Sequence, residues 1–231
     1  MCGRYSLSAH GPAQLRTRFP IGEAVEVRQR FNVAPGDEVL TVTTDRAGAP
    51  RGELLRWGLV PQWADDPRVG MKMINARAET LLERPAFRPA LERFRCLIVA
   101  DGFYEWQAQE GAPKQPFHIT RADQAPFAFA GLWAVWARGT ADELRTCTII
   151  TTAANPRLEA VHPRMPVILD PQLERPWLDP AVGAAEALSL LGGLDAAHTA
   201  LRPVGPAVND ARYDGAACLD DPLPPAQSAL F

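Results

Sequence analysis

The sequence predicts an α+β fold: one compact domain, rich in β-structure, with a mostly antiparallel sheet in a barrel-like core and short helices around it. Two observations favour this class. Apolar runs of strand length outnumber helical stretches along the 231 residues, a length that allows one large domain with an ample core. These runs also do not alternate with long helices, as the strands of a doubly wound parallel sheet would.

Six apolar runs are predicted to be strands, because they combine strand length with β-branched or aromatic residues. They cover residues 38–43, 96–100, 117–120, 127–136, 147–152 and 166–169. Four stretches are predicted to be helices from their proline starts, helix-forming residues or glycine ends. They cover residues 12–19, 76–83, 85–94 and 181–191. We therefore expect one domain over residues 1–219, with a flexible, proline-containing tail at 220–231.

Composition places the chain among ordinary globular proteins, with 47% hydrophobic and 22% charged residues. It has neither a signal-peptide pattern nor an apolar run of membrane-spanning length, so we expect a cytoplasmic protein without membrane contact. Four cysteines and four histidines are too scattered for a metal site, and we expect no metal and no cofactor. The net charge of −3 gives no global indication of nucleic-acid binding.

The cysteine at position 2 is the most informative residue. Aminopeptidases usually remove a methionine that precedes a small side chain, and loss of Met1 would leave Cys2 with an α-amine and a thiol on adjacent carbons. An aldehyde condenses with such an amine to an imine, which the thiol closes into a thiazolidine ring. The amine titrates near ~7.7–8.0 and the thiol near ~8.5, so both are partly nucleophilic at neutral pH. The alternative is an ordinary cysteine in a frayed terminus.

Two further segments carry aromatic or polar residues in patterns with more than one interpretation. Residues 31–36 and 56–63 contain Pro35 and two tryptophans, which suit a stacking platform for bases or a core corner, and from these residues alone we favour the core. At 75–80, an extended chain would place Asn75 and Arg77 on one face, which suits a sugar and a phosphate. Alternatively, Asn75 is the N-cap of a helix.

Two titratable residues are candidates for proton transfer. Glu105 follows an apolar run and lies among aromatic residues, whose desolvating effect would raise its pKa and make it a general acid or base. The alternative is a surface glutamate on an edge strand. His162 and Arg164 alternate with prolines, which stiffen the backbone and direct both side chains to one side. A histidine placed in this way can shuttle a proton.

Taken together, these segments resemble the SOS-response-associated peptidase (SRAP) family, the abasic-site processing proteins. Seven stretches match in the family's order and span residues 2 to about 169: MCGRY, FNVAP, RWGLVPQW, NARAET, DGFYEW, FAGLW and HPRMPVIL. The resemblance implies a compact, β-rich α+β fold with a basic groove for single-stranded DNA. It also implies that Cys2 forms a reversible thiazolidine crosslink with the ring-opened aldehyde of an abasic site and so shields the lesion.

The resemblance further implies a role for each matching residue. Asn75 would position the terminal amine and the opened sugar, Glu105 would transfer protons during imine formation and reversal, and His162 would assist at the sugar oxygen. The residues expected to contact DNA are Arg4, Arg77, Arg164, Pro35, Trp63 and Trp106. We also expect lyase and self-processing activities, a monomer, binding at junctions of single- and double-stranded DNA, and association with the nucleoid when the protein is bound to DNA.

Two other classes of function fit parts of the sequence. Met-Cys-Gly also begins amidotransferases that use a terminal cysteine as nucleophile. Those enzymes use an Asn-Gly pair for their oxyanion hole, and no Asn-Gly pair occurs here. The second alternative is a module that binds single-stranded DNA noncovalently, for which Cys2 would be incidental. Substitution of Cys2 by alanine separates this module from a crosslinking protein.

Overall fold

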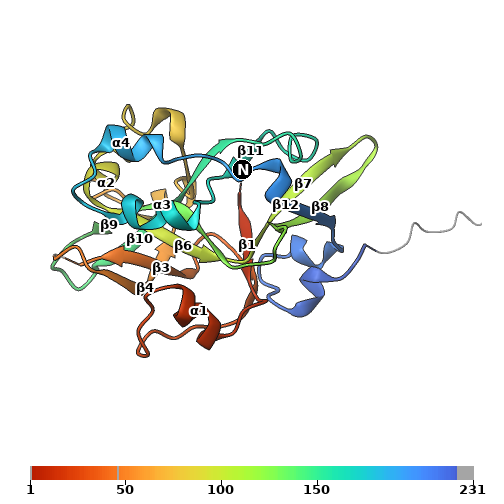
Figure 1. Cartoon of the computed structure of the whole chain (residues 1–231), viewed down its shortest axis with the longest axis horizontal. Helices are drawn as coiled ribbons and strands as arrows, with labels where there is room; N and C mark the ends of the chain where they lie inside the picture. The colour runs from red at the N-terminus through yellow and green to blue at the C-terminus, as the bar shows by residue number, and fades with distance from the viewer. Residues whose placement is uncertain (1, 46, 223–231) are drawn as a thin grey trace, which may run out of the picture.

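The computed structural model describes residues 2–45 and 47–222, and its strands form two sheets that pack against each other (Figure 1). The five-stranded sheet contains, from edge to edge, β12 (Thr199–Pro203), β8 (Ala112–Arg121), β7 (Gly102–Gln109), β1 (Arg4–Leu7) and β2 (Arg30–Val33). The seven-stranded sheet contains β11 (Arg164–Pro166), β10 (Leu144–Ala153), β4 (Pro50–Trp57), β3 (Glu38–Thr44), β6 (Arg95–Ala100) and β9 (Phe127–Trp136), with β5 (Asn75–Arg77) beside β10.

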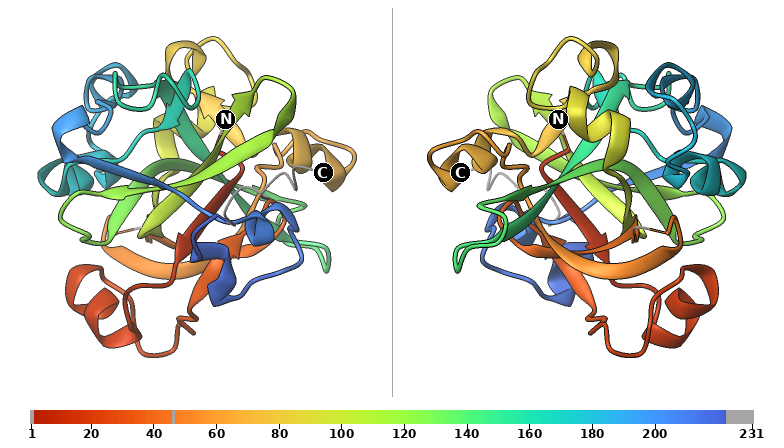
Figure 2. Two further views of the ribbon diagram at one scale, coloured as in Figure 1. Left: turned by 90° about the vertical axis from the view of Figure 1, so that its right-hand side faces the viewer. Right: turned by 90° about the vertical axis from the view of Figure 1, so that its left-hand side faces the viewer.

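Most strand pairs are antiparallel, and the larger sheet closes on itself. β9 pairs with both β6 and β10, while β10 pairs in parallel with β4, so β10, β4, β3, β6 and β9 form a closed barrel. β10 also pairs in parallel with β5. The α+β class with a β-rich, mostly antiparallel, barrel-like core is therefore confirmed. Strand β1 runs through the middle of the molecule, where it reaches both sheets (Figure 2).

Two hydrophobic clusters hold these layers together, and strand residues alternate between them. In β9, Phe127 and Phe129 join a cluster that connects the two sheets, whereas Ala128 and Ala130 join a cluster that packs the helices. Both faces of β9 are thus buried, which explains why its sequence is a continuous apolar run. The helices are α1 (Pro12–Arg18), α2 (Arg88–Arg93), α3 (Pro171–Leu178) and α4 (Ala184–Ser189). None of the described helices is long and apolar enough to cross a membrane.

The elements predicted from apolar runs are largely confirmed. Five of the predicted strands lie within β3, β6, β8, β9 and β10, and three predicted helices contain α1, α2 and α4. The predicted strand at 166–169 is wrong except at Pro166, which ends β11; Ile168 makes only a single bridge to Phe129. Helix α3 was missed, although Asp170 accepts a bond from the backbone of Gln172 and Pro171 occupies the first helical turn, as N-terminal helix signals predict.

The helix predicted over residues 76–83 is wrong. Asn75–Arg77 form β5, and Ala78–Thr80 form a single 3-10 turn. In β5, Asn75 is paired with Ile149 of β10 and Arg77 with Thr151. These inter-strand contacts outweigh the local helix propensity of an alanine- and glutamate-rich segment, because propensity is a weak preference that tertiary pairing overrides.

The C-terminal part of the described chain covers the outer face of β7. Short 3-10 segments η4 (Pro206–Asn209) and η5 (Ala216–Leu219) follow β12, and a small cluster beneath them contains Tyr104, Val208 and Cys218. The other 3-10 segments are η1 (Pro67–Lys72), η2 (Ala78–Thr80) and η3 (Ala196–His198). Of the tail predicted at 220–231, residues 223–231 lie outside the described residues.

Candidate active site

Cys2 lies immediately before β1 and is fully buried in the cluster that joins the two sheets. The interpretation as a frayed terminus is therefore wrong. The side-chain Nδ2 of Asn75 donates a hydrogen bond of 2.8 Å to the backbone carbonyl of Cys2. The other end of this amide, Oδ1, is buried and accepts no hydrogen bond from the described residues. Asn75 thus fixes the backbone of Cys2 and keeps one acceptor available beside it.

The position of Asn75 on a strand decides between the two interpretations of its segment. Because β5 is extended and pairs with β10, the N-cap interpretation is wrong. Asn75 and Arg77 pair with Ile149 and Thr151, two residues that lie on the same face of β10. Arg77 is exposed, so its guanidinium lies at the surface while the amide two residues earlier reaches Cys2.

Glu105 is buried on β7, with only 4% of its surface exposed, so it is not a surface residue of an edge strand. Its Oε1 lies 4.0 Å from Nδ1 of His162. Burial raises the pKa of Glu105 above its ordinary value, and the neighbouring His162 acts in the opposite direction. The carboxyl therefore retains its proton to higher pH than an exposed glutamate does, as the sequence predicts.

His162 reaches Glu105 from the turn that precedes β11. The backbone N–H of His162 donates to the carbonyl of Leu158 at 2.9 Å. Its Nδ1 lies 3.1 Å from the backbone nitrogen of Arg164 and 3.0 Å from the carbonyl oxygen of Arg164. The imidazole is thus oriented by its own turn, and Pro163 restricts that turn further.

The thiol of Cys2 belongs to the same electrostatic environment as Glu105. Burial, and secondly the carboxyl of Glu105, raise the pKa of the Cys2 thiol well above its ordinary value. The sulfur lies 3.8 Å from the carbonyl oxygen of Arg4, a weak contact for a thiol. Cys2 is therefore kept in the protonated form, which is the less nucleophilic one.

The three arginines expected to bind phosphates have different surroundings. Nη1 of Arg4 donates to Oδ1 of Asn32 at 3.0 Å and to the carbonyl of Val208 at 2.8 Å. Arg164 forms a two-point ion pair with Glu79, at 2.6 and 3.0 Å, so both terminal nitrogens have an acceptor within the protein. Arg77 is exposed. Arg77 thus has the most accessible guanidinium of the three, and Arg164 the least available one.

The residues expected to contact bases also differ in exposure. Trp57 is fully buried, and Trp63 is 64% exposed. The core interpretation is therefore correct for Trp57 and wrong for Trp63. Trp106 is partly buried and donates its indole N–H to Oδ1 of Asn209 at 2.7 Å. Pro35, also partly buried, lies in the turn between β2 and β3.

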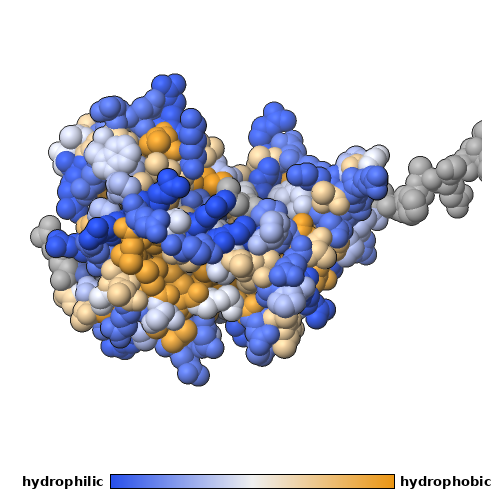
Figure 3. Space-filling view, turned by 90° about the horizontal axis from the view of Figure 1, so that it is seen from above, coloured by the Kyte–Doolittle hydropathy of each residue, from blue (hydrophilic) through white to orange (hydrophobic). Residues whose placement is uncertain are grey.

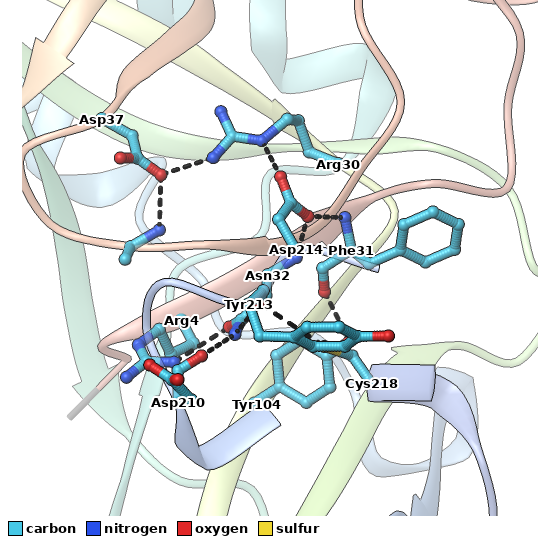
Figure 4. A network of polar contacts seen from close by, with 11 residues as sticks. Arg4, Arg30, Phe31, Asn32, Asp37, Tyr104, Asp210, Tyr213, Asp214 and Cys218 are labelled. Carbon is cyan, nitrogen blue, oxygen red and sulfur yellow. Dashed lines mark hydrogen bonds and ion pairs between the residues drawn. The ribbon is translucent and has the colours of Figure 1, made fainter. Parts of the chain in front are cut away.

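The site lies near the N-terminus, which Figure 1 marks in the upper middle of the molecule, and Figure 3 shows the molecule from above. Hydrophilic residues run across the middle of this face, beside an apolar patch. Sequence reasoning missed the residues that hold the C-terminal segment against β2, among them Asn32 and Asp214 (Figure 4). No local pattern could have found this contact, because it joins positions about 180 residues apart in the chain.

The fold and the site define a β-barrel protein with a buried cysteine at position 2, surrounded by an amide, a carboxyl and an imidazole. The family model described as SOS response associated peptidase (SRAP) matches residues 1–211, and the chain belongs to this family. It is 42% identical over 226 residues to the abasic site processing protein YoaM of Bacillus subtilis. The matched region covers 95% of this chain and 98% of YoaM.

Other relatives agree with this assignment. The chain is 35% identical over 229 residues to the abasic site processing protein YedK of Escherichia coli, which covers 94% of this chain and 97% of YedK. A crystal structure of a protein from Bacteroides thetaiotaomicron has a TM-score of 0.82 and 25% identity, and covers 96% of this chain and 100% of that one. The family and the fold therefore extend over nearly the whole chain.

Proposed function

We propose that this protein recognises abasic sites in single-stranded DNA and crosslinks to them through Cys2 after Met1 has been removed. One observation carries the proposal: the amide of Asn75 bonds the Cys2 carbonyl and keeps a buried acceptor next to it. An α-amine formed at Cys2 is the natural donor for that acceptor. The names of YoaM and YedK, both abasic site processing proteins, support this choice of substrate.

The chemistry follows from the order in which the groups of Cys2 can react. The α-amine attacks the aldehyde carbon of the opened sugar and forms a carbinolamine. Loss of water from that carbinolamine needs a proton donor, and Glu105 supplies the proton, because its raised pKa favours the protonated form. The thiol then adds to the imine carbon, and its proton passes to the nitrogen. One water is released per thiazolidine, and reversal consumes one.

Asn75 and His162 complete the proton path in this proposal. Asn75 orients the amine, and His162, 4.0 Å from the carboxyl of Glu105, exchanges protons with that carboxyl and with the sugar oxygen. Arg4, Arg77 and Arg164 are proposed to bind phosphates, and Pro35, Trp63 and Trp106 to contact bases. The covalent bond supplies the lifetime of the complex, so noncovalent affinity can be modest.

Further activities are proposed for the same residues. The imine makes the neighbouring C–H of the sugar acidic, so a base such as Glu105 or His162 could cleave the DNA strand by elimination. Removal of Met1 by the protein itself would expose the amine of Cys2. We also propose that the protein acts as a cytoplasmic monomer, associated with the nucleoid when bound to DNA, and that junctions of single- and double-stranded DNA are substrates.

The decisive experiment mixes the purified protein with a single-stranded oligonucleotide that contains one abasic site, followed by a denaturing gel. We expect a heat-stable adduct with this DNA and none with an intact oligonucleotide. Cys2→Ala should abolish the adduct, because both the thiol and ring closure are lost, and Cys2→Ser should leave a more labile product. An N-terminal tag that retains Met1 should also block it. Full heat-stable crosslinking by Cys2→Ala would refute the proposal.

A further inference from the structure

Asn32 is the centre of a polar network between β2 and the C-terminal segment (Figure 4). It is 1% exposed, and its Oδ1 accepts the 3.0 Å bond from Arg4. Its Nδ2 lies within hydrogen-bond distance of three backbone carbonyls of the C-terminal segment, at 2.8 to 3.3 Å: Val208, Asp210 and Tyr213. One side-chain amide thus joins a cation of β1 to a turn near the end of the domain.

The network leaves the other edge of Arg4 available for a ligand. In the described part of the chain, both side-chain hydrogen bonds of Arg4 use Nη1. The edge formed by Nε and Nη2 is the one that can bind two oxygens of a phosphate side by side. Because Nη1 is fixed by Asn32 and by the carbonyl of Val208, this edge is held in one orientation.

The same segment also fixes Trp106. The guanidinium carbon of Arg4 lies 6.0 Å from the centre of the Trp106 ring, and Asn209 accepts the indole N–H at 2.7 Å. Residues 208 and 209 therefore contact Arg4 and Trp106, which come from two different strands. A cation and an aromatic ring held in this way suit a phosphate and the adjacent base of a single strand.

The ends of the network secure it against movement. Asp214 accepts the backbone N–H groups of Phe31 and Asn32, at 2.6 and 2.9 Å, and pairs with Arg30. Arg30 also bonds Asp37 at 2.5 Å. The carboxylate of Asp37 in turn accepts the backbone N–H of Ala34 at 3.0 Å, in the turn that carries Pro35.

We propose that Asn32 is a positioning residue for nucleic-acid binding: it holds Arg4 beside Trp106 so that both meet one phosphate and its base. This inference rests on the proposed function. Only an amide supplies the acceptor for Arg4 and the donors for the C-terminal carbonyls together. Aspartate would keep the acceptor and lose the donors, and serine would be too short to bridge the two.

The test measures noncovalent binding separately from crosslinking. Fluorescence anisotropy with a single-stranded oligonucleotide that carries a tetrahydrofuran abasic analogue, which has no aldehyde, gives Kd over a range of salt concentrations. We expect Asn32→Ser to raise Kd about fivefold and to lower the salt slope by about 0.7, the value of one phosphate contact with a single strand. The maximal crosslinking rate at saturating abasic DNA should stay unchanged.

A double-mutant comparison separates positioning from general weakening. Arg4→Ala should cause a similar loss, and the Arg4→Ala/Asn32→Ser double variant should lose little more, because both changes remove the same contact. Tyr104→Phe is the matched control. Tyr104 is paired with Arg4 across β1 and β7, but its hydroxyl bonds the carbonyl of Phe31 at 2.7 Å, so removal of the hydroxyl leaves both side-chain hydrogen bonds of Arg4 in place. This variant should lower thermal stability to a similar extent and leave Kd and the salt slope unchanged.

The proposal is overturned if Asn32→Ser binds with the affinity and salt slope of the wild type, or if the Asn32 and Arg4 effects add in full. Should Asn32→Ser fail to fold, Asn209→Ala tests whether the C-terminal segment positions Trp106, because this change removes the hydrogen bond to the Trp106 indole. We expect it to raise Kd without changing the salt slope. Unchanged binding by Asn209→Ala then counts against the proposal. Wild-type protein that binds the analogue but forms no adduct with DNA carrying a natural, aldehyde-bearing abasic site refutes the proposed function alone. Wild-type protein that does not bind the analogue refutes both.

Discussion

Two buried polar clusters lie along β1 and β7, and they differ in whether a buried acceptor is left without a hydrogen bond from the described residues. In the Asp101 cluster (Ser6, Asp101 and His118), Asp101 accepts Ser6 Oγ at 2.8 Å and two backbone N–H groups at 2.6 Å. Ser6 Oγ also lies 3.0 Å from Nε2 of His118. In the Cys2 site, Asn75 Oδ1 is buried and accepts no hydrogen bond from the described residues.

This difference fits a structural role for the Asp101 cluster and the reactive role that we propose for the Cys2 site. A satisfied buried network rigidifies the fold, whereas unsatisfied buried groups cost stability and persist where a ligand or a reaction uses them. The two clusters also differ in the direction of their pKa shifts: burial lowers the pKa of His118 to about 4 and raises the pKa of Glu105. The buried imidazole of His118 is held neutral at physiological pH, while burial favours the protonated form of the Glu105 carboxyl.

A single short stretch contributes to both clusters. Gly102 has no side chain, and a Cβ there would lie 2.1 Å from Nε2 of His118, so only glycine lets the imidazole reach Ser6. Asp101 precedes it, and Glu105, whose carboxyl raises the pKa of the Cys2 thiol, follows three residues later. The Asp-Gly-Phe-Tyr-Glu sequence thus serves packing at one end and carries, at the other, the carboxyl for which we propose a role in proton transfer.

The largest effect that the comparison predicts comes from Glu105→Gln. This change keeps the shape of the side chain and removes its proton, so we expect crosslinking to slow by about 100-fold or more, the usual contribution of a general acid. Reversal should slow at least as much. The measurement is the rate of adduct formation and release at saturating protein against pH. Glu110→Gln, on the exposed hairpin between β7 and β8, is the matched control and should leave both rates unchanged.

The same variant should gain stability at high pH. A raised pKa means that the folded state binds the Glu105 proton more tightly than the unfolded chain does. Its contribution to the free energy of unfolding is therefore complete below the ordinary glutamate pKa and is lost as pH rises through the raised pKa. Glu105→Gln avoids this loss, so its melting temperature should exceed that of the wild type at pH 8. Lower stability at pH 8, with wild-type rates, would place Glu105 among the structural residues.

For Asp101→Asn we expect the opposite pattern: a loss of stability with an unchanged rate of crosslinking. Asp101 Oδ2 accepts both backbone N–H groups, so the new amide can keep its oxygen there only with its NH2 group turned towards Ser6 Oγ, which must then accept instead of donate. Because the charge-assisted hydrogen bonds of the carboxylate are lost, we expect the free energy of unfolding to fall by about 2 kcal/mol. Denaturant unfolding measures this change. Crosslinking at saturating DNA, well below the melting temperature, should be unchanged, because the partners of this carboxylate among the described residues are Ser6, the backbone of Ser8 and Ala9, and His10, which lie outside the Cys2 site. A variant of normal stability with slow crosslinking would break the distinction between the two clusters.

The sequence predicted the parts of this comparison that local patterns encode. Cys2 was informative because its chemistry depends only on its position, and Glu105 because apolar and aromatic neighbours surround it in the chain. The Asp101 cluster was not predicted, since Ser6 and His118 are 112 positions apart and meet only when β1 and β8 pair with β7. Asn75 was ambiguous for the same reason: its strand exists because β10 lies beside it.

The smallest expected effect is on DNA binding, and it compares an exposed arginine near the Cys2 site with one near the Asp101 cluster. Arg77 is exposed near the Cys2 site, whereas Arg121, on the strand that carries His118, pairs with Asp123 at 2.7 Å. An unpaired guanidinium can neutralise a phosphate at once, but a paired one must first exchange its carboxylate. Arg77→Ala should therefore weaken single-stranded DNA binding roughly fivefold and lower the salt slope by about 0.7, while Arg121→Ala should do neither.

Anisotropy titrations at four or five salt concentrations distinguish these outcomes, because the slope depends on the number of phosphates neutralised and not on stability. Equal losses from Arg77→Ala and Arg121→Ala would mean that DNA follows the charge of the whole surface, and the Cys2 end would then have no privileged contact. A loss confined to Arg77→Ala would place a phosphate beside Asn75, two residues from the amide that holds Cys2. The short strand β5 would then carry both a phosphate contact, Arg77, and the amide that positions Cys2, Asn75.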